Sequence, residues 1–184
     1  NSLILPQAEE LMSGNIKFRW FLLAPILVVL FVVISSPVVS LAESLEDAQE
    51  LVWQNPNDAN AHYALGYAYG RSGQYQEAIA SFKEAIRIKP DYADAHNNLG
   101  ATYAEIKRYQ KAIASFKEAI RIKPDNASPH YGLGYAYDEL GQYKEAIASY
   151  KEALRINPDL TIARNNLNKL EQKTADERLA LEQR

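Results

Sequence analysis

The segment QYQEAIASFKEAIRIKPD, residues 74–91, decides the fold, because the chain repeats it twice more. It returns as RYQKAIASFKEAIRIKPD at residues 108–125 and as QYKEAIASYKEALRINPD at residues 142–159, which gives a period of 34 residues. A fixed period of this size is typical of an array of repeated structural units. We therefore predict three copies of one unit, at residues 59–92, 93–126 and 127–160.

The repeated segment has the spacing of a helix with one apolar face. Its apolar residues recur at steps of three and four, which places them on one stripe: Ala78, Ile79, Phe82, Ala85, Ile86 and Ile88. A proline follows the stripe in every copy, and it ends the helix. A more variable helical stretch precedes the segment, so each copy is predicted to be an antiparallel pair of helices.

Residues at the helix boundaries predict how the helices are joined. Gly73 and Gly141 allow a left-handed turn between the two helices of the first and third copies, whereas the second copy has Lys107 there. Asp91 and Asp125 follow the closing prolines, and we expect their carboxylates to accept hydrogen bonds from the first free amides of the next helix.

The three copies resemble the tetratricopeptide repeat family, whose pattern is an L-G pair, a Tyr, A-x3-F and a closing Pro. The matching residues are Leu65, Gly66, Tyr69, Ala78, Phe82 and Pro90, then Leu99, Gly100, Tyr103, Ala112, Phe116 and Pro124, then Leu133, Gly134, Tyr137, Ala146, Tyr150 and Pro158. The resemblance implies an all-α fold, an α-solenoid in which antiparallel helix pairs form a right-handed superhelix. We also expect each glycine of the L-G pair to lie against the small alanine of its copy.

The segments that flank the array are predicted to be capping helices. Residues 43–58 have apolar residues at helical spacing before Asn55-Pro56, as in the second helix of a degenerate repeat. Residues 161–184 form a closing helix and a charged tail, with Ile162, Leu167 and Leu170 as its apolar positions. A helix with one polar face is what a solenoid needs over its last apolar surface.

The N-terminal region predicts export or membrane attachment. After a leader at residues 1–19 that contains Lys17 and Arg19, residues 20–34 are an unbroken apolar run, and residues 20–42 form the whole segment. Fifteen helical residues span about 22 Å, which is less than the ~30 Å hydrocarbon core, but an extension to Ala42 reaches about 35 Å. An N-terminal apolar helix is thus expected, either as a membrane anchor or as a signal peptide.

Two details bear on that choice. Pro37 and the small residues before Glu43 suit cleavage after Ala42, and a start at Met12 would give a short basic leader. Under either alternative the basic residues precede the run and acidic residues follow it, which predicts repeats on the extracytoplasmic side, periplasmic or extracellular.

Composition and motifs argue against catalysis, cofactors and nucleic acid as a partner. The chain has no cysteine, a net charge of −3 and no basic stripe. It also lacks a phosphate-binding glycine loop, an H-E-x-x-H motif and a serine triad pattern. We therefore predict a protein that is not an enzyme and that needs no cofactor or metal.

The histidines invite a metal interpretation, because His62, His96 and His130 occupy the same place in each copy. Neighbouring copies are separated by about one helix diameter, ~10 Å. Zinc ligands must each lie within ~2.1 Å of the ion. The three imidazoles therefore cannot share one ion, and we interpret them as residues that pack between helices.

The first helix of each copy lines the concave groove in the family that the chain resembles. Carried over residue by residue, the principal peptide-binding positions are Tyr63, Tyr67, Arg71, Asn97, Asn98, Glu105, Tyr131, Tyr135, Glu139, Asn165, Asn166 and Lys169. Minor positions of the same groove are Asn60, Ala64, Asp94, Ala101, Ser128 and Gly132. Tyrosine pairs thus alternate with asparagine pairs along the predicted groove.

These residue types suit an extended peptide, because Asn offers donors and an acceptor to a backbone and Tyr adds rigid contact area. The alternative is that the tyrosines only pack against the adjacent hairpin. Members of the family that clamp acidic tails use Lys, Asn and Arg where this chain has Tyr63, Tyr67, Ser128 and Gly132, so the sequence does not support such a clamp.

The function predicted from the sequence is a scaffold that binds an extended segment of a partner protein. Two alternatives stay open: a structural protein that self-associates at a membrane, and an accessory subunit of a membrane-associated complex.

Overall fold

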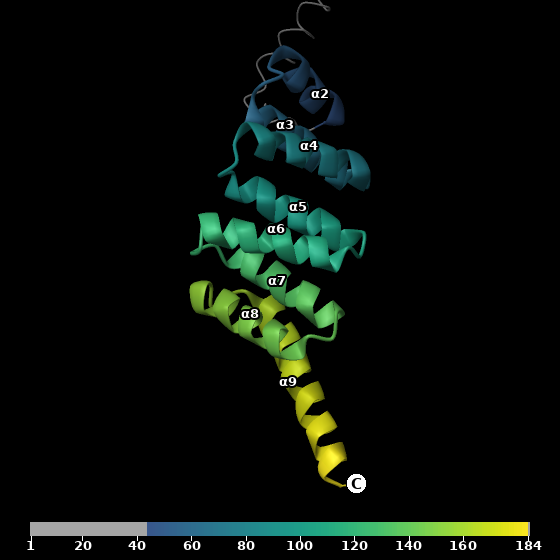
Figure 1. The fold of residues 1–184 in the computed structure, drawn as a ribbon, viewed down its shortest axis with the longest axis vertical. Coiled ribbons are helices and arrows are strands. Elements are labelled where there is room, and N and C mark those ends of the chain that lie inside the picture. The colour runs from purple at the N-terminus through teal and green to yellow at the C-terminus, as the bar shows by residue number, and fades with distance from the viewer. Residues whose placement is uncertain (1–43, 184) are drawn as a thin grey trace, which may run out of the picture. The chain divides into compact units, whose positions relative to one another are not determined.

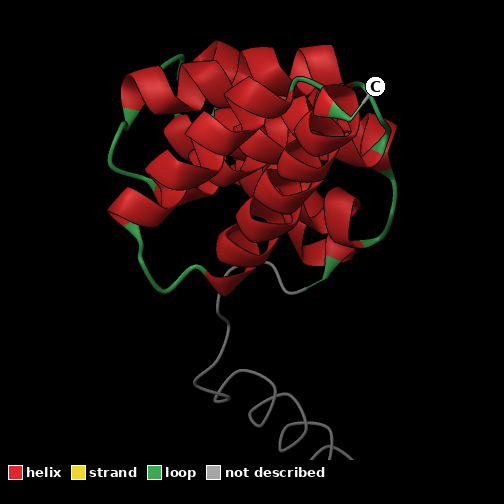
Figure 2. Cartoon of the chain, turned by 90° about the horizontal axis from the view of Figure 1, so that it is seen from below, coloured by secondary structure: helices red, strands yellow, loops and turns green. Residues whose placement is uncertain are grey.

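A computed structural model describes residues 44–183 of the chain, and these form eight α-helices and no strand (Figures 1 and 2). The helices are α2 (Leu45–Gln54), α3 (Ala59–Arg71), α4 (Tyr75–Ile88), α5 (Ala93–Glu105), α6 (Tyr109–Ile122), α7 (Ala127–Glu139), α8 (Tyr143–Ile156) and α9 (Thr161–Glu182). Each helix packs on the next one in the chain, and α3, α5 and α7 also contact one another in turn. The predicted all-α solenoid of helix pairs is confirmed for this part of the chain.

The second helix of each copy buries the stripe that the sequence predicts. In α4 the side chains of Ala78, Ile79, Phe82 and Ala85 are buried, and the corresponding residues of α6 are buried as well. Burial of one large apolar side chain contributes about 1.5–3 kcal/mol. Buried residues of α4 to α7 form one core cluster, and those of α8 and α9 form a second.

The second helix of each copy ends before its proline, as predicted. The helices that follow, α5 and α7, begin one residue later than predicted. Lys89 is already extended, with φ −128° and ψ 90°, since the residue before a proline avoids the helical region. The expectation for Asp91 and Asp125 was wrong. Tyr92 and Asn126 hold the N-cap positions, and the Asn126 side chain accepts the hydrogen bond from Ser128 N.

A left-handed residue joins the two helices of each copy. Gly73 and Gly141 have φ of 75° and 72°, and Lys107 has φ 57°, so Lys107 takes the predicted turn although it is not glycine. The residue that follows donates its amide to the carbonyl five positions earlier, as in Arg108 N to Tyr103 O at 2.8 Å. This is the hydrogen bond of the Schellman motif, which satisfies the free carbonyls at a helix end.

The flanking helices lie at the two ends of the array. Ser44 and Asp47 cap α2 reciprocally, and α2 packs on α3. At the other end α9 buries Ala163, Leu167 and Leu170 against α8. The expectation that Ile162 is part of this buried face was wrong, because Ile162 is 52% exposed.

The predicted leader, signal peptide or anchor at residues 1–42 lies outside the described residues. Among the helices that the structure describes, none combines the length and the apolar character needed to cross a bilayer.

We predict that Lys107→Gly raises the free energy of unfolding by about 0.5 kcal/mol, because glycine adopts positive φ without steric cost. The gain is small, since glycine also has more freedom to lose on folding. Urea denaturation measures the change.

Gly141→Lys is the matched control. A Cβ at Gly141 would meet nothing within 4 Å, so this substitution isolates the backbone cost and should lower stability. If Lys107→Gly proves destabilising, the Lys107 side chain contributes more than its backbone conformation costs.

One hydroxyl of the core lacks a hydrogen-bond partner. The Tyr150 side chain is fully buried, and its oxygen is the unsatisfied buried polar atom of the described side chains. Burial raises the pKa of Tyr150, and the nearby Asn166 amide opposes that rise without reaching hydrogen-bond geometry. The first two copies have Phe82 and Phe116 at this place.

We predict that Tyr150→Phe raises the free energy of unfolding by about 1 kcal/mol, because a buried unsatisfied hydroxyl is removed and the ring stays. Urea denaturation of both proteins, with and without Asn166→Ala, completes a double-mutant cycle. A loss of stability that disappears in the Asn166→Ala background would show that Asn166 does bind this hydroxyl.

Candidate functional site

The first helices of the three copies form a surface with two adjoining hollows. The α3–α5 hollow has a volume of about 220 Å³ and is lined by Tyr67, Gly70, Arg71, Tyr75, Phe82, Asn98, Ala101, Thr102 and Glu105. The α5–α7 hollow has a volume of about 330 Å³ and is lined by Asn97, Ala101, Ala104, Glu105, Phe116, Ser128, Tyr131, Gly132 and Tyr135. Ala101 and Glu105 belong to both hollows, so the hollows adjoin along α5, and we call the two of them the groove across α3, α5 and α7.

The floor of each hollow is a buried aromatic ring. Phe82 and Phe116 are 2% and 3% exposed, whereas Ala101 and Glu105 at the mouth are exposed. A Cβ added to Gly66 would lie 2.7 Å from the Phe82 ring. The sequence led us to expect that this glycine makes room for the alanine of its copy, but it makes room for the ring. The groove thus has an apolar floor beneath a polar and accessible rim.

Gly132 brings the floor of the α5–α7 hollow unusually close to the backbone. A Cβ at Gly132 would lie 2.4 Å from Cζ of Phe116, which is too close for two carbon atoms. The corresponding positions in the neighbouring helices are Asn98 and Asn166. The absence of a side chain at Gly132 therefore admits the Phe116 ring into this hollow.

The alternation of tyrosine and asparagine pairs produces contacts between copies. Asn98 Nδ2 donates to the Tyr63 hydroxyl at 3.0 Å, and Tyr131 and Asn166 occupy the same two places at the α7–α9 interface. Burial raises the pKa of Tyr63, with a further rise from Asp94, while the Asn98 hydrogen bond lowers it. At the α5–α7 interface the two places are Asn97 and Gly132, so this bond cannot form there.

Seven of the twelve principal positions predicted from the sequence line the groove. These are Tyr67, Arg71, Asn97, Asn98, Glu105, Tyr131 and Tyr135. The other five, Tyr63, Glu139, Asn165, Asn166 and Lys169, line neither hollow. The Tyr63 ring lies against the Tyr92 ring, with ring centroids 5.0 Å apart.

Several lining residues were missed by sequence reasoning. Phe82 and Phe116 were assigned only to the core, and Tyr75 to the start of the second helix. A signal for Tyr75 was present, because a tyrosine begins this helix in every copy, at positions 75, 109 and 143.

Thirty residues after each of these tyrosines stands the residue at the same place of α5, α7 or α9, which is Glu105, Glu139 or Lys173. The Tyr109 hydroxyl donates to the Glu139 carboxylate at 2.9 Å, which raises the pKa of Tyr109 to about 12. Lys173 Nζ donates to the Tyr143 hydroxyl at 2.6 Å. Tyr75 and Glu105 both line the α3–α5 hollow, but no hydrogen bond joins them.

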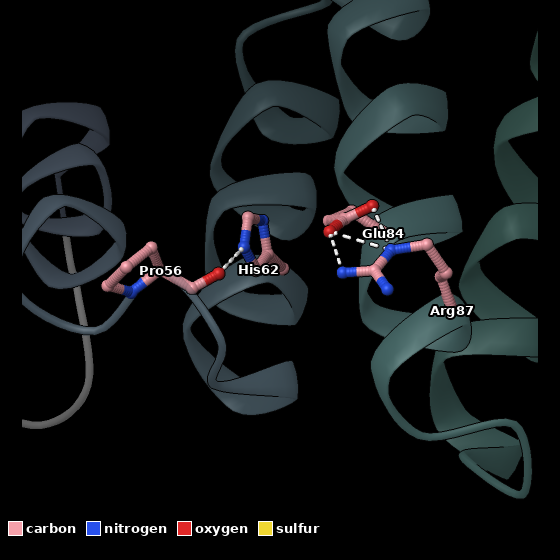
Figure 3. Close-up of polar contacts among 4 residues, drawn as sticks. All are labelled: Pro56, His62, Glu84 and Arg87. Carbon is pink, nitrogen blue, oxygen red and sulfur yellow. Dashed lines mark hydrogen bonds and ion pairs between the residues drawn. The ribbon is translucent and has the colours of Figure 1, made fainter.

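The histidines bind the loops that join successive copies. Nε2 of His62 lies 2.8 Å from the carbonyl oxygen of Pro56, as Figure 3 shows, and His96 and His130 contact Pro90 and Pro124 in the same way. Arg164 donates to the carbonyl oxygen of Pro158 at the corresponding place in α9. These contacts account for the recurrence of the histidines without a metal.

A glutamate from the second helix stands on the other side of each histidine. In Figure 3 Glu84 faces His62, and Arg87 binds Glu84 through two nitrogens. The Arg87 guanidinium holds the pKa of Glu84 below its usual range. No group of three or more metal-ligating side chains occurs within residues 44–183.

The comparisons with known proteins agree with this architecture. Models of the tetratricopeptide repeat match residues 40–93, 63–127 and 127–160. A comparison with curated protein sequences gave no match.

Among solved structures, MamA from Desulfovibrio magneticus RS-1, from its residue 41 to the end, is 26% identical to this chain. That match covers 78% of this chain and 81% of that one, with a TM-score of 0.68. The first TPR of Spaghetti (RPAP3), bound to the HSP90 peptide SRMEEVD, is 24% identical, and the match covers 64% of this chain and 94% of that one with a TM-score of 0.63. The Arabidopsis OM64 TPR domain is 25% identical over 62% of this chain and 95% of that one, with a TM-score of 0.62.

The three copies with their helix pairs, the glycine-to-ring contacts and the family models, which match well over half of the sequence, lead to one conclusion: the chain belongs to the tetratricopeptide repeat family.

Proposed function

We propose that this chain is an interaction scaffold that binds an extended segment of a partner protein along the groove across α3, α5 and α7. The observation that carries the proposal is that the two hollows adjoin and share Ala101 and Glu105. One ligand chain that follows the groove can place side chains in both hollows.

The size of the hollows supports a peptide more than a small metabolite. Pockets for drug-sized molecules have volumes of about 300–1,000 Å³. One hollow, at about 220 Å³, is below that range, and the other, at about 330 Å³, is at its lower limit. Hollows of this size suit single side chains of a longer ligand.

The rim offers the groups that an extended backbone needs. Tyr67 is 52% exposed and presents a broad face at the edge of the α3–α5 hollow. Asn97 and Ser128 provide amide and hydroxyl groups beside the α5–α7 hollow. Such groups hydrogen-bond a peptide backbone irrespective of its sequence.

The relatives support the same class of function. Tetratricopeptide proteins generally act as scaffolds without catalytic activity, and the RPAP3 structure contains a bound peptide. That peptide, SRMEEVD, has three acidic residues. In the present groove Glu105 lies between the two hollows, and its carboxylate would repel an acidic peptide. The segment that binds this groove is therefore not acidic as SRMEEVD is.

The N-terminal sequence supports a location outside the cytoplasm. Basic residues before the apolar run at residues 20–34 and acidic residues after Ala42 favour repeats that are exported or tethered to a membrane with the array outside.

Self-association is the second candidate, and exposed apolar side chains at the ends of the array favour it. Trp53 of α2 is 79% exposed, and Leu179 and Leu181 of α9 are 54% and 70% exposed. The mass of the full chain in solution over a concentration series tests it. Assembly that persists when the groove is blocked would favour this candidate over peptide binding.

We predict that Ala101→Arg reduces peptide affinity at least about tenfold, which corresponds to about 1.4 kcal/mol. Ala101 is exposed at the mouth of both hollows, so an arginine fills the groove without disturbing the core. Peptides selected from a random display library on the full chain serve as ligands, and fluorescence anisotropy measures the affinity.

The matched control is Ala114→Arg, an exposed alanine of α6 outside both hollows. It adds the same side chain and charge and should leave affinity unchanged. Equal loss in both variants, or selection of no peptide at all, would contradict the groove proposal.

We also predict that the protein is recovered from the extracytoplasmic fraction of its cells. N-terminal sequencing and membrane fractionation distinguish a chain that begins at Glu43 from one that keeps residues 20–42 and stays in the membrane. An uncleaved chain in the cytoplasm would contradict the proposed location.

A further inference from the structure

We propose that the segment bound in the groove carries a lysine or arginine next to an apolar residue, with the cation paired to the Glu105 carboxylate and the apolar side chain in the α5–α7 hollow. This inference rests on the proposed function and adds the chemistry of the partner.

The position of Glu105 gives no benefit to its own helix. Glu105 is the last residue of α5, where the partial negative charge of the helix end disfavours a carboxylate. The corresponding residue of α3, Arg71, ends its helix with the charge that such a position prefers, whereas Glu139 ends α7 with a carboxylate, as Glu105 does in α5.

The carboxylate of Glu105 also lacks the contact that its counterparts make. Glu139 receives a hydrogen bond from Tyr109, and Lys173 donates one to Tyr143. Glu105 stands in the same relation to Tyr75, yet it forms neither a hydrogen bond nor an ion pair with any described residue. Its carboxylate is therefore available to a ligand at the point where the two hollows meet.

The surrounding charges favour a cation on the α5–α7 side. Glu105 is the charged residue of the α5–α7 lining. The α3–α5 lining contains Arg71 as well, which would repel a ligand cation from that side. Farther along the first helices are the carboxylates of Asp94, Asp138 and Glu139, and α9 has Lys169 and Lys173.

The apolar part of the ligand follows from the floor of the same hollow. Phe116, Ala104 and the rings of Tyr131 and Tyr135 surround a space of about 330 Å³. Gly132 leaves the Phe116 ring uncovered by a side chain at that position. An apolar side chain beside the cation would remove the half-buried rings of Tyr131 and Tyr135 from water while the cation stays at the exposed rim.

The test uses peptides selected from a random display library on the full chain. Some selected peptides will compete with one another for the wild-type chain and fail to bind the Ala101→Arg variant. Their sequences should be enriched in a basic residue next to an apolar one. Replacement of that basic residue by Glu should lower affinity for the wild-type chain at least about tenfold, less so at high salt.

Glu105→Lys should reverse this preference, so that it binds the Glu-containing peptide better than the basic one. Glu105→Gln should weaken binding of the basic peptide and yet slightly raise the melting temperature, because it removes a carboxylate from a helix C-terminus. A merely structural role of Glu105 would not couple weaker binding to higher stability. Glu145→Gln, at an exposed site on α8, controls for the change in net charge.

The outcomes separate the two proposals. Selection of no groove-dependent peptide would overturn the proposed function itself. Peptides that depend on the groove but show no basic enrichment, and bind Glu105→Lys as they bind the wild type, would overturn only the inference about charge.

Discussion

The contact on which the array depends is the insertion of an aromatic ring against a glycine backbone. In each copy a ring of the second helix, Phe82, Phe116 or Tyr150, lies where the Cβ of any residue other than glycine would stand. This close approach sets the distance between the two helices of the hairpin. The first two rings are also the floor of the groove, so one contact supports both the fold and the candidate site.

Much of the fold could be predicted because its signals are local. The apolar stripe of α4, the proline that ends it and the left-handed turn at Gly73 each depend on a few adjacent residues. The prediction that Gly66 faces Ala78 failed because spacing along a helix does not show how far a side chain reaches. A long side chain lies back over the preceding turn, so the Phe82 ring reaches the glycine itself.

The candidate site was less accessible to sequence reasoning, because its residues act between copies. Tyr63 and Asn98 were both assigned to ligand binding, but their hydrogen bond joins α3 to α5. Nothing in either helix alone indicates that pairing, since it spans a separation of one period plus one residue. Lining residues that were missed, such as Phe82 and Tyr75, have the ordinary character of a helix core and a helix start and become distinctive only through their neighbours.

The larger of the two hollows lies where the repeat pattern is broken. Tyrosine and asparagine stand at equivalent places of the α3–α5 and α7–α9 interfaces, but the α5–α7 interface has Asn97 and Gly132. A tyrosine–asparagine hydrogen bond like that of Tyr63 and Asn98 is absent there, and Asn97 and Gly132 line the larger hollow instead. Lys107, the one described residue other than glycine with positive φ, belongs to the second copy, as Asn97 does. The tyrosine–asparagine pattern is thus interrupted between the second and third copies.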